Sequence, residues 1–138
     1  MIVQGQTTSF KKELYEAIHN FTTDTFKIAL YTANASLSQD TLIYSVVDEI
    51  SGAGYTAGGK NLVAPTVNAA DGAAYISFNN ISWPTSSFTT RGALIYNSSK
   101  ANRSVAVLDF GSDKVTTSTF TITFPVNTAT SALIRSSN

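Results

Sequence analysis

The helical spacing of apolar residues occurs once in this sequence, near the N-terminus, and this limits the folds that the chain can adopt. Five apolar residues recur there at the spacing of one helix face: Phe10, Leu14, Ala17, Ile18 and Phe21. Ser9 precedes them and is a residue type that caps helices. We therefore expect one helix at residues 9–20, preceded by an extended N-terminal arm at residues 1–8.

From Phe26 onwards the sequence shows the short apolar runs and two-residue alternation of β-strands. Eight runs are found, at residues 26–31, 42–47, 62–67, 73–78, 92–96, 105–110, 120–124 and 132–134. Turn-forming residues separate them, at 52–54, 58–59, 68–72, 97–99 and 111–113. Helical spacing does not return between the runs, which argues against parallel βαβ units. Residues 9–138 are expected to form a single mainly β domain, an antiparallel β-sandwich or barrel that is jelly-roll-like and carries one N-terminal helix. We expect the core to draw on the large apolar members of these periodic segments: Phe10, Leu14, Ile18, Ile28, Leu30, Ile76, Phe78, Leu94, Tyr96, Val107, Phe120, Ile122 and Phe124.

The charge balance argues against several classes of partner. Nine basic and nine acidic side chains give a formal net charge of zero, and only 13% of the residues are charged. A nucleic-acid-binding or lipid-binding protein usually carries a basic patch, so we expect no nucleic acid and no membrane partner. The sequence shows no secretion signal and no apolar run of about 18 residues. We expect a soluble protein made in the cytoplasm. The chain has no cysteine, which removes disulfides and thiolate metal sites.

Residues 54–60 have the G-x-x-x-x-G-K spacing of a phosphate-binding P-loop. That motif continues with Ser or Thr, which binds magnesium, and with a helix that faces the phosphates. Here Asn61 takes the hydroxyl position, and Pro65 interrupts the segment that follows. We expect a glycine-rich connection between strands and no nucleotide cofactor.

The remaining reactive residues do not assemble a known catalytic pattern. Asp109, Phe110 and Gly111 read like the magnesium loop of protein kinases, but the catalytic-loop partners are missing, and we expect a strand that ends at Phe110 and turns at 111–113. His19 is the single histidine, and we expect it to stabilise the end of the helix. Asp48 and Glu49 form the single adjacent carboxylate pair, and neighbours in a strand point to opposite faces.

We therefore assign no catalytic, cofactor-binding or metal-binding residue and expect a protein that is not an enzyme. A carboxylate pair assembled from distant positions stays open. Four aromatic residues could form a platform on which a sugar stacks, but we expect them to serve in packing: Tyr55, Trp83, Phe88 and Tyr96.

Five stretches resemble a family of small virion structural proteins of tailed bacteriophages. They lie at residues 27–32, 54–59, 83–97, 105–111 and 120–125, and the similarity runs from about Phe10 to Arg135. The resemblance implies a capsid decoration, or cement, protein that binds the outside of the assembled head and stabilises it. Its implied partners are the major capsid protein and further copies of the chain, as a dimer or trimer. The motifs do not separate this role from that of another virion component.

The start of the chain is the segment that we expect to contact a partner, because it precedes the first regular element and offers unpaired backbone groups. It comprises Ile2, Val3, Gln4, Gly5 and Gln6. In this interpretation the protein is made in the cytoplasm of the host bacterium and ends on the capsid exterior. Two alternatives stay open: a tail or fibre module that binds host-surface glycans, and an enzyme of unfamiliar design.

Overall fold

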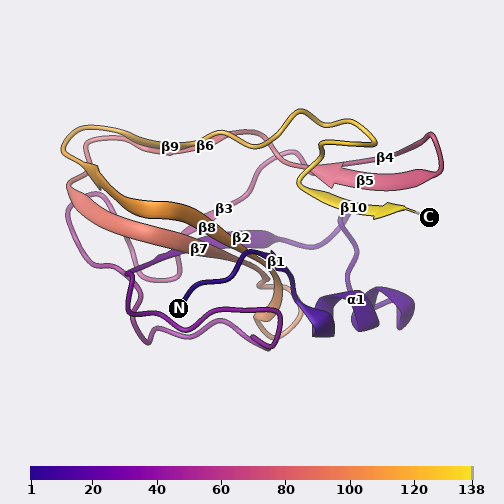
Figure 1. The fold of residues 1–138 in the computed structure, drawn as a ribbon, viewed down its shortest axis with the longest axis horizontal. Coiled ribbons are helices and arrows are strands. Elements are labelled where there is room, and N and C mark those ends of the chain that lie inside the picture. Colours follow the sequence, from indigo (N-terminus) through magenta and orange to yellow (C-terminus); the bar gives the residue numbers. More distant parts are fainter. Residues whose placement is uncertain (138) are drawn as a thin grey trace.

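The computed structural model describes residues 1–137 and shows a mainly β protein with one helix and antiparallel sheets, which confirms the predicted fold class (Figure 1). The elements are β1 (Gly5–Gln6), α1 (Thr8–Tyr15), β2 (Phe26–Tyr31), β3 (Lys60–Asn61), β4 (Thr66–Ala70), β5 (Ala73–Ser77), β6 (Ile81–Trp83), β7 (Phe88–Asn97), β8 (Arg103–Thr116), β9 (Phe120–Ile122) and β10 (Ile134–Ser137).

The strands form three sheets in which every neighbouring pair is antiparallel. The largest has the order β1-β8-β7-β2-β3, a second has the order β10-β5-β4, and a third pairs β6 with β9. In Figure 1 the two smaller sheets lie side by side above the large sheet, so the molecule has two layers in a sandwich-like arrangement. This division of strands does not establish a jelly roll.

The helix is shorter than residues 9–20 and has a different cap. Thr7, not Ser9, is the N-cap: its Oγ1 accepts a hydrogen bond from the Phe10 N–H at 3.3 Å. The helix ends because Ala17 adopts a left-handed conformation with a φ of 58°. The N–H groups of Ala17 and Ile18 then donate back to the carbonyls of Leu14 and Glu13, at 3.2 and 3.0 Å, which satisfies the last turn.

The expected turn at residues 111–113 is wrong, because β8 continues through it to Thr116. Gly92 of β7 is opposite Asp109, and Thr90 is opposite Lys114, so four residues of β8 face the single residue Arg91. Gly111, with a φ of 80°, supplies the left-handed conformation that such a bulge requires. A glycine that reads as a turn therefore bends a strand of 14 residues.

The other runs differ in detail. Residues 42–47 form no strand and contribute one isolated bridge, between Ile43 and Arg103. Most of the run at 62–67 lies between β3 and β4, and its last two residues begin β4; β6 at 81–83 has no counterpart among the expected runs. The β4–β5 turn is confined to Asp71 and Gly72, both with positive φ, which is the two-residue hairpin turn that matches strand twist.

The five-stranded sheet is buried on both faces, and this explains the long apolar strands β2 and β7. Phe26, Ile28 and Leu30 of β2 belong to the main core between the layers. Ala29 and Tyr31 point to the opposite face and join a second cluster, whose other members are Ile2, Ala35, Leu37, Leu94, Tyr96 and Val107. The N-terminal segment and the residues after β2 cover that second face.

Candidate functional site

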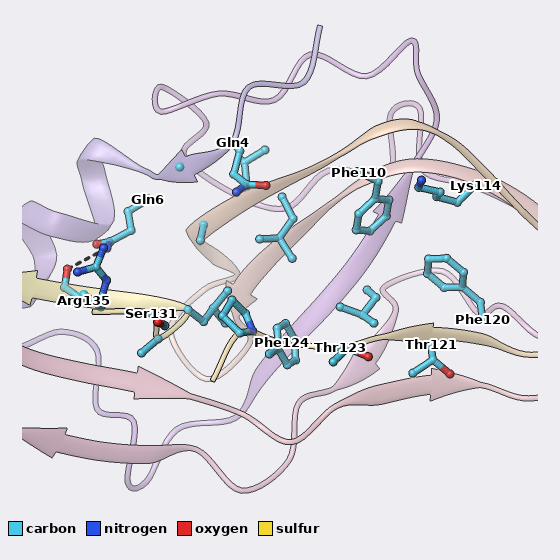
Figure 2. Close-up of a pocket in the computed structure, with 18 of the residues that line it drawn as sticks. Gln4, Gln6, Phe110, Lys114, Phe120, Thr121, Thr123, Phe124, Ser131 and Arg135 are labelled. Atoms are coloured by element: carbon cyan, nitrogen blue, oxygen red, sulfur yellow. Dashed lines mark hydrogen bonds between the residues drawn. The ribbon is translucent and has the colours of Figure 1, made fainter. Parts of the chain in front are cut away.

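A groove of about 720 Å³ opens between β8 and β9, within the size range of ligand pockets (Figure 2). Its apolar lining includes Leu108, Phe110, Phe120, Ile122, Phe124 and Leu133. Polar side chains stand around it, among them Gln4, Gln6, Lys114, Thr121, Thr123, Ser131 and Arg135. The rings of Phe110 and Phe120 meet edge to face across it, with centroids 5.9 Å apart.

The groove lies along a strand edge that has no neighbouring strand over most of its length. β1 pairs with β8 at Ala106 and Val107 alone, so β8 has no partner on that side from Leu108 onwards among the described residues. Side chains take the place of a strand there. The Asp109 N–H donates to Gln4 Oε1 at 3.0 Å, and the Gly111 N–H donates to Asp109 Oδ1 at 2.9 Å.

A second surface is the loop at residues 42–47, which presents four large aliphatic side chains to solvent. Leu42, Ile43, Val46 and Val47 are 57–69% exposed. The loop is nevertheless held firmly. The N–H of Tyr44 donates to Asn102 O at 3.0 Å, the N–H of Ser104 donates to Leu42 O at 2.9 Å, and Tyr31 Oη donates to Ser45 O at 2.6 Å. We call residues 42–47 the aliphatic loop.

Glu49 anchors the aliphatic loop to the second face of the sheet. Its carboxylate accepts hydrogen bonds from Tyr44 Oη at 2.6 Å, from Tyr55 Oη, and from the Gly58 N–H at 2.8 Å. Burial and hydrogen bonding to this carboxylate raise the pKa of both tyrosines above its usual value. Tyr96 stacks on Tyr44 with centroids 4.7 Å apart, and burial together with the charge of Glu49 raises the pKa of Tyr96 to about 12.

The structure also places Asp48 and Glu49, the two carboxylates that are adjacent in the sequence. Asp48 is exposed and Glu49 is half-buried, and their side chains do not share a set of partners. Glu49 is surrounded by hydrogen-bond donors that hold two loops together, so its position indicates a structural clamp.

The P-loop-like segment is a connection between strands, as expected. The Gly58 N–H donates to a protein carboxylate, and the strand β3, not a helix, begins at Lys60. Gly59 packs so closely on β2 that an added Cβ would lie 1.8 Å from Ile28 O. Lys60 Nζ donates to Ser82 O and lies 5.8 Å from the centre of the Trp83 ring.

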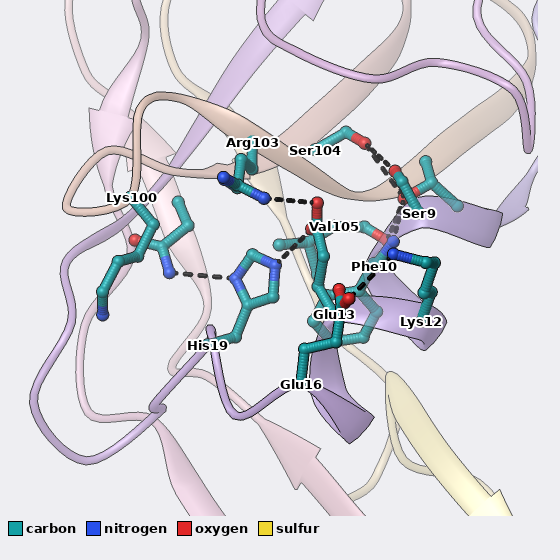
Figure 3. A network of polar contacts seen from close by, with 12 residues as sticks. Ser9, Phe10, Lys12, Glu13, Glu16, His19, Lys100, Arg103, Ser104 and Val105 are labelled. Atoms are coloured by element: carbon teal, nitrogen blue, oxygen red, sulfur yellow. Dashed lines mark hydrogen bonds and ion pairs between the residues drawn. The ribbon is translucent and has the colours of Figure 1, made fainter.

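His19 is buried in a chain of polar contacts that joins the region after α1 to the sheet (Figure 3). Asn97 Nδ2 lies 3.0 Å from His19 Nδ1, and because an amide nitrogen only donates, Nδ1 is the acceptor. His19 Nε2–H then donates to Glu13 Oε1 at 2.8 Å, and Arg103 donates to Glu13 Oε2 at 2.8 Å. His19 thus contacts the end of α1 through the side chain of Glu13, which lies near the C-terminal end of the helix.

The same chain of contacts continues to Asp24, whose side chain is only 7% exposed. Burial raises the pKa of Asp24, but hydrogen bonds from Lys100 and Asn97 and from the Asn20 N–H outweigh burial and lower this pKa to about 2. Lys100 Nζ is 2.9 Å from both carboxylate oxygens. The network thus fastens the segment before β2 to the β7–β8 turn.

The four aromatic residues considered for sugar stacking serve in packing, as expected. Trp83, Phe88 and Tyr96 are each 6% exposed or less, and Tyr55 is half-buried against the main core. Their ring faces are covered by other core residues, so they do not form an exposed platform.

The N-terminal residues are paired within the chain, which corrects the expectation of free backbone groups there. The N–H of Val3 donates to Leu37 O at 2.8 Å, and Gly5 and Gln6 pair with β8. Ile2 is buried in the second cluster. The contact of residues 2–6 with a partner stays a prediction, and it would have to use the exposed residues Val3 and Gln4 and the outer edge of β1.

Comparisons with known proteins add no family: no family model, curated protein or solved structure matches the chain. Within residues 1–137 no three His, Asp or Glu side chains are grouped as metal ligands. The helix in the same part of the chain is too short and polar to span a membrane.

The sequence prediction missed both surfaces. The aliphatic loop had one available signal: Leu42–Ile43 and Val46–Val47 are adjacent apolar pairs, which do not fit the alternation of a half-buried strand. The groove had no such signal in the sequence, because the segments that line it are brought together only by the tertiary fold.

Proposed function

We propose that this chain is a non-enzymatic structural protein of a bacteriophage virion, a decoration protein that binds the exterior of the assembled head and stabilises it. The observation that carries the proposal is the aliphatic loop: a firmly held segment with four aliphatic side chains in solvent. Large exposed apolar patches usually mark interaction sites. The resemblance to small virion proteins supplies the class of partner, the major capsid protein.

The way the aliphatic loop is held favours binding. Hydrogen bonds from Tyr31, Tyr44 and Ser104 fix its backbone before any partner arrives. Less conformational freedom is then lost on association, so more of the free energy of apolar burial contributes to affinity. A protein that binds the assembled shell more tightly than its alternatives stabilises that shell by mass action.

The proposed assembly is a dimer or trimer located on the capsid exterior. Because the chain has a net charge of zero and the loop side chains are uncharged, we expect attachment to depend on shape and apolar contact. Binding should then persist at salt concentrations that weaken a charge-driven complex.

The experiment compares particles that contain and lack this protein for resistance to heating, and adds purified variants back to bare particles. Val46→Asp with Val47→Asp should abolish attachment, because each charge would be buried in an apolar contact. The matched control is Val63→Asp with Val67→Asp, two residues of similar exposure elsewhere, and it should attach normally. Protein found only on the tail, with bare heads equally robust, would reject the proposal and favour the tail or fibre module.

A further inference from the structure

We propose that the groove between β8 and β9 binds an extended acidic peptide segment of a partner protein, which adds as a strand to the free edge of β8. This inference is independent of the proposed function, since no residue of the aliphatic loop lines the groove. It rests on three observations: an opening in the core, an unpaired strand edge, and the charge of the rim.

The core is incompletely covered at the groove. Six partly buried apolar residues pack against the main cluster, and four of them line the groove: Leu108, Phe110, Phe120 and Leu133. They come from both layers of the sandwich, from β8 on one side and from β9 and the segment before β10 on the other. An apolar side chain entering from outside would complete this part of the core.

The free edge of β8 runs beside the groove, which Leu108, Phe110 and Lys114 of the same strand line, and it carries backbone groups that an added strand can use. The N–H groups of Asp109 and Gly111 are bonded to the side chains of Gln4 and Asp109, not to a neighbouring strand. β9 likewise has β6 as its single strand neighbour in the described chain. An added strand pairs its backbone with such an edge and places alternate side chains towards the apolar floor.

The charged side chains that line the groove indicate which kind of peptide it would bind. Lys114 and Arg135 are the charged residues among those that line the groove, and both are basic. Both are exposed, and within residues 1–137 neither forms an ion pair with a carboxylate. In Figure 2 they lie towards opposite ends of the groove. A strand with a carboxylate towards either end matches this arrangement.

The test begins with selection of binders from a library of random twelve-residue peptides on the full-length protein. We expect the selected peptides to alternate apolar residues with polar ones and to carry Asp or Glu. Their binding should shift the NMR amide signals of Leu108, Gly111 and Phe120. The signals of the aliphatic loop should not shift, which separates this site from the one in the proposed function.

Two variants test the charge and the edge separately. Lys114→Gln with Arg135→Gln should weaken the selected peptides about tenfold, the sum of two exposed ion pairs. The charge-matched control Lys11→Gln with Lys12→Gln should leave binding unchanged, because both lysines lie on α1 and outside this groove. Gln4→Ala should tighten binding a few-fold, because the Asp109 N–H no longer has to exchange one acceptor for another.

Three results would overturn the inference. The first is the absence of any enriched peptide. The second is equal binding to the wild-type protein and to the Lys114→Gln, Arg135→Gln variant. The third is weaker binding to Gln4→Ala together with displacement of the peptides by decanoate at similar concentration, which would assign the groove to an anionic amphiphile.

Discussion

The Nδ2 atom of Asn97 lies 3.0 Å from the Nδ1 atom of His19, although the two residues are 78 positions apart. The same amide nitrogen donates to Asp24 Oδ2 at 2.9 Å, so one buried side chain joins two segments to the end of β7. Asn97 Oδ1 in turn accepts from the Ser99 N–H at 3.0 Å. A single amide therefore determines how the helix, the segment before β2 and the β7–β8 turn fit together.

Asn97→Leu should destabilise the fold by about 2–4 kcal/mol, because it leaves buried partners unsatisfied while nearly preserving volume. Urea unfolding of the variant and the wild-type protein measures the difference. Asn34→Leu changes an exposed asparagine and serves as the control, with an expected effect within about 0.5 kcal/mol. Equal midpoints for Asn97→Leu and wild type would contradict the role assigned to this amide.

The lowered pKa of Asp24 predicts a dependence of stability on pH. Its pKa falls from 3.8 to about 2 on folding, so the unfolded chain binds the proton more readily. The associated stability, about 2 kcal/mol, is present above pH 4 and is lost as the pH falls through 2. Asp24→Asn should be less stable than wild type at pH 6 and nearly equal to it near pH 2. A difference that is the same at both pH values would rule out this linkage.

The core predicted from the sequence can be tested at two positions that the structure buries. Leu94 is 0% exposed in the second cluster, and Ile122 is 8% exposed in the main core. Leu94→Ala and Ile122→Ala should each cost about 2–5 kcal/mol. Leu14→Ala is the control, because Leu14 is 37% exposed, and it should cost clearly less. An effect of Leu14→Ala as large as the other two would show that the helix packs differently.

Alanine substitutions at Gly59 and Gly111 distinguish the cost of backbone strain from the cost of a steric clash. Both glycines have a φ of 80°, so the strain is similar and only the surroundings differ. Gly111→Ala has no atom within 4 Å of the new Cβ and should cost about 1–2 kcal/mol from strain alone. Gly59→Ala would place Cβ 1.8 Å from Ile28 O, a backbone atom that cannot move freely, and should cost considerably more. Thermal unfolding of the two variants compares them, and similar melting temperatures would contradict the close approach of Gly59 to β2.

Lys60→Ala tests the interpretation of the P-loop-like segment. The change removes a hydrogen bond to Ser82 O and the contact with the Trp83 ring, so a loss of about 1 kcal/mol in stability is expected. Calorimetry with ATP should show no binding by either protein, because Gly58 and Lys60 are engaged by groups of the chain itself. Tight ATP binding that Lys60→Ala abolishes would overturn this interpretation.

The sequence predicts the class of fold because that class follows from local periodicity. β2 and β7 were recognised since they are long and apolar, and Phe10 was placed in the core by helical spacing. Of the residues that the same pattern placed in the core, Leu14 is exposed and Ile18, Ile76 and Phe120 are half-buried. Whether a periodic face is fully buried depends on which residues pack over it. The periodicity of the sequence carries no information about those neighbours.

The errors at residues 42–47 and 111–113 have the same kind of cause. A run of apolar residues reads as a strand whether or not a neighbour is available to pair with it. Gly111 reads as a turn although its pairing partner, β7, continues past it. Residues 2–6 precede the first expected element, and their backbone groups therefore read as unpaired. Their partners, at Leu37 and Val107, lie far along the chain and are not visible in the local sequence.

The two side chains that cover the β8 edge, Gln4 and Asp109, also have a consequence for self-association of the protein. A bare strand edge offers unpaired N–H and C=O groups to exposed edges of other molecules, which promotes aggregation. With these two acceptors in place, a second copy gains little by docking there, because it must first displace bonds that are already made. Only a strand that also brings apolar side chains and carboxylates gains enough free energy to displace these hydrogen bonds. The edge is therefore selective among the strands that could bind to it.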